Sequence, residues 1–397
     1  MKHVIPVSPS FQPPIRNENK LKLGLFGPNC SGGLAPTTVP ERWRNTWENN
    51  LALARMADDA GLEFLLPIAR WIGYGGKTDF HGSVLDSMTW AAGLLASTKH
   101  INIFATVHTA VHHPVVIAKQ IATLDQIGNG RVGLNVVVGW NPPEFQALGI
   151  SLPVDRTSRY TLGQEWLDIV VKLWYGPGPF DWNGQHYQLQ RVYSEPRPIV
   201  SPIPIFNAAI SAEGREFAIR NAEYLFTAAI DLRTAREDIR ALKANADKLG
   251  RRAGALTFCY VVCRPSAKEA TEYHRYYAQQ HTDHDAVDRL IDTMLPHSKT
   301  LPATVQAIIR NNFAGGHGGR ALIGDPDMVA DGLEAISATG FDGTTLAFVD
   351  YAGEFPYFRD EVIPRLERRG LRRPFRPHID GNSAAAATRQ CATYQTA

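Results

Sequence analysis

One amide side chain interrupts a strand-like apolar run and marks the first place where this chain could do chemistry. Asn135 lies within the run 130–138, which is bounded by glycine at both ends and followed by Trp140. An unbroken apolar run of this length is typical of a parallel strand covered on both faces. A buried amide without a partner costs about 1–3 kcal/mol. Asn135 therefore predicts a polar neighbour, and in a closed barrel of parallel strands that neighbour is often a ligand.

Other polar residues follow the apolar runs, where parallel strands of a barrel end and active-site loops begin. They are Asn29-Cys30-Ser31, Ala69-Arg70-Trp71, Thr106, His108, Thr109, Trp140 and Ser211. They contain no nucleophile triad and no closely spaced carboxylate pair. This absence favours a cofactor that does the chemistry while the protein orients it.

Ser211 stands just before a helix expected near 216–222, with Gly214 close behind it. A serine at this position caps the first turn, and free backbone N–H groups and the helix dipole favour a phosphate there. Two interpretations remain open, a phosphate site and a plain helix cap.

Metal binding is not expected. His108 and His112 have helical i, i+4 spacing, but Pro114 disfavours a helix at His113, and no carboxylate follows before Asp125. The four cysteines fit neither a disulfide framework nor a zinc site, which favours a reducing compartment.

The composition of the chain limits the kinds of binding partner that we expect. The 397 residues carry a formal net charge of +2, with 44% hydrophobic and 20% charged residues and no Lys/Arg block, so nucleic acid is not an expected partner. No leader-like or membrane-spanning segment stands out, so we expect no membrane association and a cytoplasmic protein.

Apolar strand-like runs alternate with helical ones such as 46–60, 84–97 and 114–127. Eight such strands predict an α/β fold, a (β/α)8 TIM barrel with insertions. The expected strands are 21–26, 63–66, 102–106, 132–138, 203–208, 224–227, 256–262 and 343–348. We expect an N-terminal arm at 1–20, the barrel at 21–372 and a tail at 373–397, flexible from about 380.

Two segments exceed a minimal barrel. Residues 141–202 predict a helix near 159–174 and a hairpin over 180–189 that turns at Asn183-Gly184. The insertion 265–320 predicts a helix near 267–280 and contains the run Gly315-Gly316-His317-Gly318-Gly319. That run suits a mobile lid, a phosphate-cradling loop or a plain surface loop.

Six motifs in one order resemble the bacterial-luciferase-like flavin monooxygenases over about residues 20–372. They are Leu23–Asn29 with Ser31-Gly32-Gly33, Ala54–Phe64, Ala118–Asn135, Val138-Gly139-Trp140 with Glu144-Phe145, Asp155-Arg156 with Arg159-Tyr160, and Ile323–Pro326 with Val329-Ala330. Within the family the chain looks most like the dimethylsulfone and the pyrimidine-ring-opening monooxygenases.

This resemblance implies a two-component enzyme. A separate NAD(P)H:flavin reductase would supply FMN as FMNH2, and O2 would be activated to a flavin peroxide that inserts oxygen into a small molecule. A sulfone, a heterocyclic amide or a halogenated aromatic are the implied substrate classes. Thr106 and Asn135 match residues that hold O2 beside the flavin, and a hydroxyl and an amide suit that role; the alternative is that both are structural.

The resemblance also implies the rest of the site. Ser211 and the backbone N–H groups beside it would hold the FMN phosphate, helped by Arg159 or Tyr160. Ala209 and Gly139 would also contact the cofactor, and Trp140 would line the flavin ring. Trp71, His81, His108 and Trp140 would shape the substrate pocket. Apolar residues in 84–127 exceed what two helices need, which predicts a homodimer or homotetramer.

Two other functions stay open. The same architecture serves deazaflavin- or flavin-dependent dehydrogenases, which transfer hydride and need no oxygen pocket. A non-catalytic flavin-binding protein is the alternative from another class.

Overall fold

The computed structural model describes residues 12–229 and 231–376, and its centre is a closed barrel of eight parallel strands. Neighbours around the barrel pair in the order β1, β2, β3, β4, β7, β8, β9, β11, and β11 returns to β1. The strands are β1 (Lys22–Phe26), β2 (Phe64–Leu66), β3 (Asn102–His108), β4 (Val132–Val137), β7 (Ile205–Ala208), β8 (Tyr224–Phe226), β9 (Gly254–Cys263) and β11 (Gly343–Ala347). The (β/α)8 prediction is confirmed, and each strand falls within the run that predicted it or overlaps it.

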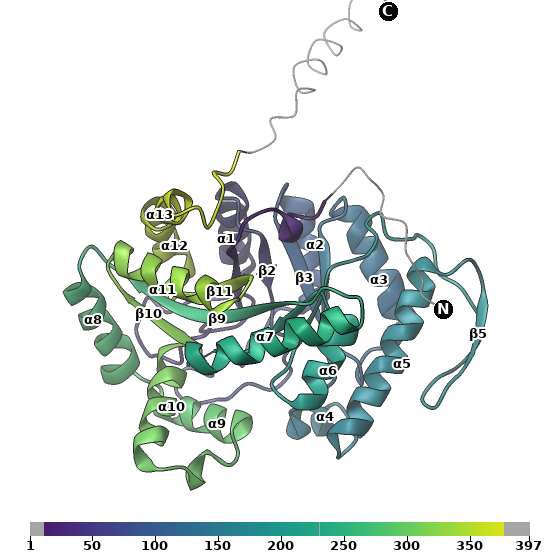
Figure 1. Cartoon of the computed structure of the whole chain (residues 1–397). Coiled ribbons are helices and arrows are strands. Elements are labelled where there is room, and N and C mark those ends of the chain that lie inside the picture. Colours follow the sequence, from purple (N-terminus) through teal and green to yellow (C-terminus); the bar gives the residue numbers. More distant parts are fainter. Residues whose placement is uncertain (1–11, 230, 377–397) are drawn as a thin grey trace, which may run out of the picture.

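Helices surround the barrel (Figure 1). Those that follow barrel strands are α1 (Trp47–Asp59), α2 (Ser87–Ser97), α3 (Pro114–Ile127), α5 (Arg156–Tyr175), α6 (Ala212–Asn221), α7 (Leu232–Lys248) and α12 (Tyr351–Glu361), with α11 (Pro326–Thr339) before β11 and α13 (Ile363–Arg368) after α12. Asp or Thr side chains cap several of them, as at Thr46 and Asp86, which is the preferred way to satisfy the first free N–H groups. None of the helices in the described ranges is long and apolar enough to cross a membrane.

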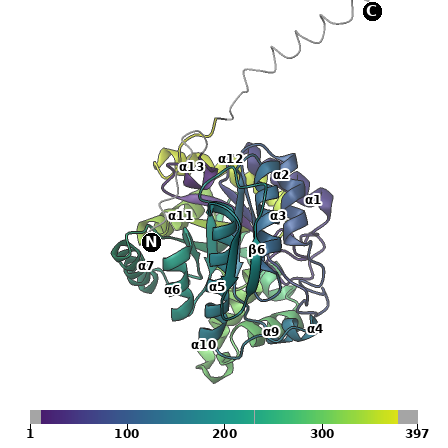
Figure 2. The ribbon, with the colours of Figure 1, turned by 90° about the vertical axis from the view of Figure 1, so that its right-hand side faces the viewer.

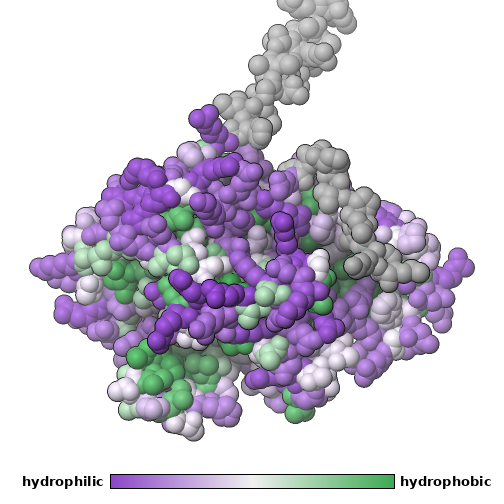
Figure 3. All heavy atoms as spheres, in the orientation of Figure 1, coloured by the Kyte–Doolittle hydropathy of each residue, from purple (hydrophilic) through white to green (hydrophobic). Residues whose placement is uncertain are grey.

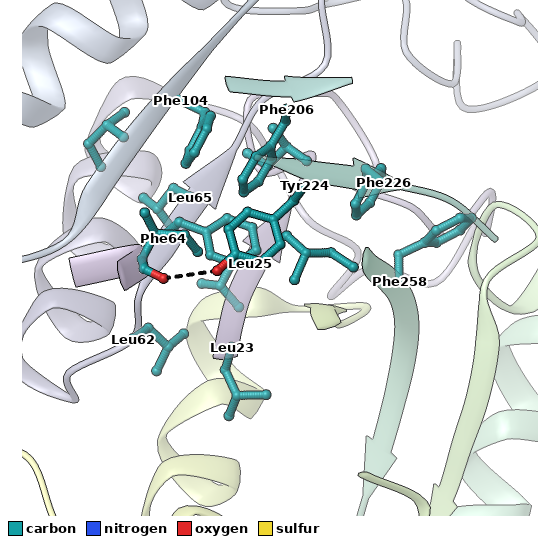
Figure 4. Close-up of a cluster of buried hydrophobic side chains, with 14 of the residues drawn as sticks. Leu23, Leu25, Leu62, Phe64, Leu65, Phe104, Phe206, Tyr224, Phe226 and Phe258 are labelled. Carbon is teal, nitrogen blue, oxygen red and sulfur yellow. Dashed lines mark hydrogen bonds between the residues drawn. The ribbon is translucent and has the colours of Figure 1, made fainter. Parts of the chain in front are cut away.

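Aromatic side chains fill the barrel interior. Phe64, Phe104, Phe206 and Tyr224 face one another there (Figure 4), with Phe104 and Phe206 stacked at 3.9 Å between ring centroids. Gly133 leaves room for Phe104, since a Cβ on it would lie 2.3 Å from that ring. Phe26, Phe226 and Phe258 continue the aromatic layer toward the carboxyl ends of the strands. These packed rings form what we call the aromatic floor of the barrel. A ligand can bind only above it, at the rim where the strands end.

The segment after β4 contains α4 (Pro142–Ala147), α5 and a hairpin of β5 (Phe180–Asn183) and β6 (Gln188–Val192), which lies along α5 (Figure 2). The prediction of a two-residue turn at Asn183-Gly184 is wrong, because the connection between the two strands is longer. Asn183 pairs with Gln188, so residues 184–187 form the connection. The Glu165 carboxylate of α5 holds this longer loop by accepting from the N–H groups of His186 and Tyr187.

The insertion after β9 contains α8 (Ala267–Arg275), a π-helical turn (Tyr276–Gln280), α9 (His284–Met294), α10 (Ala303–Gly316) and an extra strand β10 (Arg320–Gly324). β10 pairs with the second half of β9, outside the eight-stranded ring. The expected helix over 267–280 is confirmed, with its last turn π-helical.

The glycine run 315–319 is not a surface loop, because all five residues are buried. Cβ atoms on Gly315 and Gly316 would lie 2.6 and 2.4 Å from the Tyr260 ring. Glycine is needed here for the close approach of α10 to β9.

Hydrophobic side chains gather on the outer face of α9 and α10 (Figure 3). Leu301, Val305 and Ile308 are 40%, 38% and 56% exposed and follow helical spacing. On α3, Val116 and Ile127 are 53% and 44% exposed. Residues 377–397 of the predicted tail and residues 1–11 of the predicted N-terminal arm lie outside the described residues.

Candidate functional site

The pairing of β3 with β4 places Thr106 directly beside Asn135. The Asn135 amide Nδ2 donates to the Thr106 hydroxyl at 3.1 Å, and that hydroxyl donates to the Pro67 carbonyl at 2.6 Å. Both side chains are 4% exposed. The polar neighbour that Asn135 predicted is thus Thr106, one strand away.

This hydrogen-bond chain leaves unused capacity on Asn135. Its Oδ1 is buried and has no hydrogen-bond partner among the described residues, and its amide has a second N–H. The Thr106 proton, in contrast, is committed to Pro67. Asn135 is therefore the group of this pair that can still bind a small polar molecule.

Ser211 caps α6, accepting from the Gly214 N–H at 3.1 Å. The Tyr160 hydroxyl lies 2.4 Å from the position of a Cβ on Gly214. Ala209, at the end of β7, packs against the same glycine. Ser211, Tyr160 and Ala209 are thus brought together at one helix N-terminus, which favours an anion.

Arg159 does not reach this cluster in the structure. Its guanidinium donates to the carbonyl oxygens of Pro153 and Val154 at 2.6 and 2.8 Å, within the loop before α5. Its role toward a phosphate stays a prediction.

Trp140 packs against the buried side chain of Arg70. From the sequence we expected Arg70 at the end of a strand but gave it no role. The Arg70 guanidinium lies over the Trp140 and Tyr74 rings, 5.1 Å from each centroid. Its Nη1 is 3.7 Å from the Glu144 carboxylate, which also accepts from the Trp71 N–H at 2.7 Å. Gly139, just before Trp140, has φ +102°, which favours glycine at this bend.

The predicted pocket residues fall into two groups. His108 stacks on Phe145 and meets the edge of Trp71, which is 41% exposed. His81 lies apart from them and stacks on His317 of the insertion. Burial, assisted by the Arg70 charge, lowers the pKa of His108 to about 3.

Sequence reasoning gave no role to Tyr74, His317 or Asn207. Asn207 is a buried amide inside β7, where it donates to the Val136 carbonyl at 2.8 Å. The same anomaly that singled out Asn135, an amide within an apolar strand, could have found it. Within the described ranges, no group of three His, Cys, Asp or Glu side chains could hold a metal ion.

Comparison with known proteins decides the family. The model of the family described as "Luciferase-like monooxygenase" matches residues 21–343, most of the chain. The chain belongs to the luciferase-like monooxygenase family. It is similar to pyrimidine monooxygenase RutA of Allorhizobium ampelinum, with 31% identity over 377 residues that cover 92% of this chain and 100% of that protein. The chain is accordingly an oxidoreductase of the monooxygenase class.

Solved structures confirm the luciferase-like fold. DmoA from Hyphomicrobium sulfonivorans superposes with a TM-score of 0.81 at 20% identity, covering 90% of each chain. Riboflavin lyase RcaE, solved with modified FMN and riboflavin, superposes with a TM-score of 0.80 at 22% identity, covering 89% of this chain and 93% of its own. At these identities the likeness shows the fold alone.

The stability of this enzyme should fall in acid because of its buried histidines. Burial, then the Arg70 charge, lowers the pKa of His317 to about 3 in the folded chain, against about 6.5 when unfolded. Between these values the unfolded state binds more protons. The His317 contribution is therefore fully present above pH 6.5 and decreases toward pH 3, by about 1.4 kcal/mol per pH unit.

Chemical denaturation of wild type and His317→Phe from pH 7 to pH 4 measures this slope. The variant keeps a ring for stacking. Its free energy of unfolding should fall less steeply as the pH decreases, and the difference in slope should correspond to about one bound proton. Parallel slopes in the two proteins would contradict a neutral, buried His317.

Proposed function

We propose that this chain is a two-component monooxygenase that uses reduced FMN from a separate NAD(P)H:flavin reductase and inserts one atom of O2 into a small organic substrate. The unpartnered Asn135 amide oxygen at the barrel rim, beside Thr106, carries the proposal. A buried polar atom without a partner usually signals a missing ligand. The proposed substrate classes are a sulfone, a heterocyclic amide and a halogenated aromatic ring.

The residues present fit FMN. Ser211 and the first N–H groups of α6, with the Tyr160 hydroxyl beside them, offer donors to a phosphate. Trp140 and Gly139 follow β4 on the same rim and would contact the flavin ring. When bound and reduced, FMN supplies the two electrons that O2 activation requires.

Within this site the chain's own residues would position the reacting oxygen and stabilise the negative charge that develops on it. The Asn135 amide can donate its free N–H toward negative charge that develops on oxygen, in a site closed below by the aromatic floor. Thr106 fixes that amide, since its hydroxyl accepts from Asn135 while it donates to Pro67. The exposed Val116 and Ile127 of α3 support the proposed homodimer or homotetramer.

Asn135→Ala should lower product formation by about 10²–10³, the usual cost of losing one preorganised donor. Thr106→Val keeps the side-chain shape and should uncouple O2 consumption from product, while reduced-flavin binding stays nearly intact. Thermal melting and oxygen-coupled turnover are measured on the same samples.

Asn102→Ala is the matched control, because Asn102 of β3 is a buried amide whose oxygen accepts from the Ile15 N–H and whose Nδ2 donates to the Arg131 carbonyl, so no ligand is needed to satisfy it. We expect it to lose stability but to keep activity per folded molecule. Wild-type turnover from folded Asn135→Ala or Thr106→Val would end the oxygen-site proposal.

Gly214→Ala should weaken binding of FMN but not of riboflavin, which has no phosphate. The new Cβ would lie 2.4 Å from both the Tyr160 hydroxyl and the Ala209 Cβ, so it displaces the groups that face the phosphate. Equilibrium binding of both flavins measures the difference. Arg159→Met, tested in the same way, shows whether that guanidinium also reaches the phosphate.

If Gly214→Ala weakens both flavins equally, the phosphate does not bind at α6. Melting temperature separates this result from misfolding, and alanine is a better helix former than glycine.

A further inference from the structure

The start of α10 is exposed on every side and carries no charge. Residues 300–309 contain no Lys, Arg, His, Asp or Glu, and residues 301–308 are all exposed. Val305 and Ile308 share one side of the helix, since they are three residues apart, and Leu301 stands just before its first turn. We call these three residues the α10 stripe. They belong to the region where Figure 3 shows hydrophobic side chains over α9 and α10.

The charged residues at the two ends of this segment are paired within the chain. Lys299 Nζ lies 2.8 Å from Asp292 Oδ1, and Arg310 pairs with Asp288. Both aspartates belong to α9. Arg310 follows Val305 by five residues, which places it about 140° away around the helix, on the side that faces α9. The α10 stripe therefore presents an uncharged surface between two neutral ion pairs.

Such a surface differs from that of other helices around the barrel. The solvent-facing side of α7, for example, exposes Arg233, Arg236 and Arg240. Single exposed apolar residues are normal, but a contiguous group rimmed by polar residues marks an interaction site. Because the α10 stripe offers no charge to match, a charged partner would gain nothing there. The partner that fits is another uncharged, apolar surface.

The inner face of the insertion is already occupied by the loop after β2. Phe80 of that loop lies in one apolar cluster with Leu290 of α9 and Phe313 of α10. The Asp283 carboxylate, just before α9, accepts from the Thr78 N–H and hydroxyl at 2.7 and 2.8 Å. The insertion is thus fixed on its inner side, and the α10 stripe is the side that it turns to an outside partner.

We infer that the α10 stripe binds the α10 stripe of a second copy of this chain, across a two-fold axis and with the two helices antiparallel. The stripe is nearly symmetrical about Val305, because Leu301 is four residues before it and Ile308 three residues after it. A two-fold axis at Val305 therefore places Val305 against its own counterpart and Leu301 against Ile308 of the second copy. The surface is complementary to itself.

This contact selects one of the two proposed assemblies. The exposed Val116 and Ile127 of α3 form a separate apolar face, and α3 lies far from α10 in both Figure 1 and Figure 2. Two separate faces that each bind their own counterpart generate a tetramer with D2 symmetry, whereas one such face gives a dimer. The α10 contact does not depend on the reaction that the enzyme performs.

The mass of the full chain in solution, measured by sedimentation equilibrium at micromolar concentration, tests the contact. Val305→Lys brings two like charges together at the two-fold axis and should halve the wild-type mass. Ala307→Lys is the matched control, because it adds the same charge to an exposed position of the same helix about 160° away from Val305. It should keep the wild-type mass. Thermal melting shows that both variants are folded.

A cross-link tests the antiparallel geometry directly. In a Cys391→Ser background the three remaining cysteines are buried. Val305→Cys then places two thiols beside the two-fold axis, and a short bis-maleimide should join them into a covalent dimer. Ala307→Cys, on the other side of the helix, should stay uncrosslinked under the same conditions.

Three results would overturn the proposal: equal masses for wild type and Val305→Lys, an equal loss of mass in Ala307→Lys, or equal cross-linking of the two cysteine variants. If the first occurs, co-sedimentation of wild type but not of Val305→Lys with a flavin reductase, or with phosphatidylcholine vesicles, assigns the α10 stripe to that partner instead. Failure of the proposed function is seen separately, because absence of oxygenated product leaves these masses and cross-links unchanged.

Discussion

Closure of the barrel by β8–β9 pairing is the constraint on which the site depends. The eight parallel strands end on one rim, and pairing between neighbours fixes which side chains meet there. The register of β3 against β4 sets Thr106 opposite Asn135. A slip by one residue would turn Asn135 away from the interior and bring an apolar side chain into its place. The hydroxyl–amide pair is thus a consequence of strand register.

The interior combines a closed apolar floor with a polar rim. Stacked phenylalanines fill the lower barrel, so polar groups above them are shielded from water on that side. In such surroundings an unsatisfied donor or acceptor destabilises the protein. A ligand that satisfies this group removes that cost and binds more tightly for it. Asn135 and Arg70 are two described residues that keep such groups. The first is the place where we propose that oxygen binds.

Much of the fold could be predicted from the sequence, because the patterns that indicate strands and helix caps involve residues close together in the chain. Apolar strand-like runs indicated every barrel strand, and Asn135 was recognisable as an amide inside such a run, which has glycine at both ends. Ser211 could be predicted as a helix cap from its place before Gly214.

Long-range contacts could not be predicted in this way. The stack of His81 on His317 joins residues 236 positions apart, and nothing in either segment indicates the other. The glycine run 315–319 looked like a flexible loop, since the Tyr260 ring that requires small residues there lies on β9. The hairpin turn was misplaced because Glu165, on a separate helix, holds the longer loop.

The central claim is that this enzyme transfers oxygen from O2 to its substrate. It is tested most directly by supplying reduced FMN and ¹⁸O2 together with a sulfone, a heterocyclic amide and a halogenated aromatic compound in turn, and measuring the mass of each product. Oxygen transfer predicts a product that contains one ¹⁸O atom for each flavin oxidised in coupled turnover. Reduction of the oxidised flavin by the substrate under anaerobic conditions, with no ¹⁸O in the product, would contradict it and indicate a dehydrogenase.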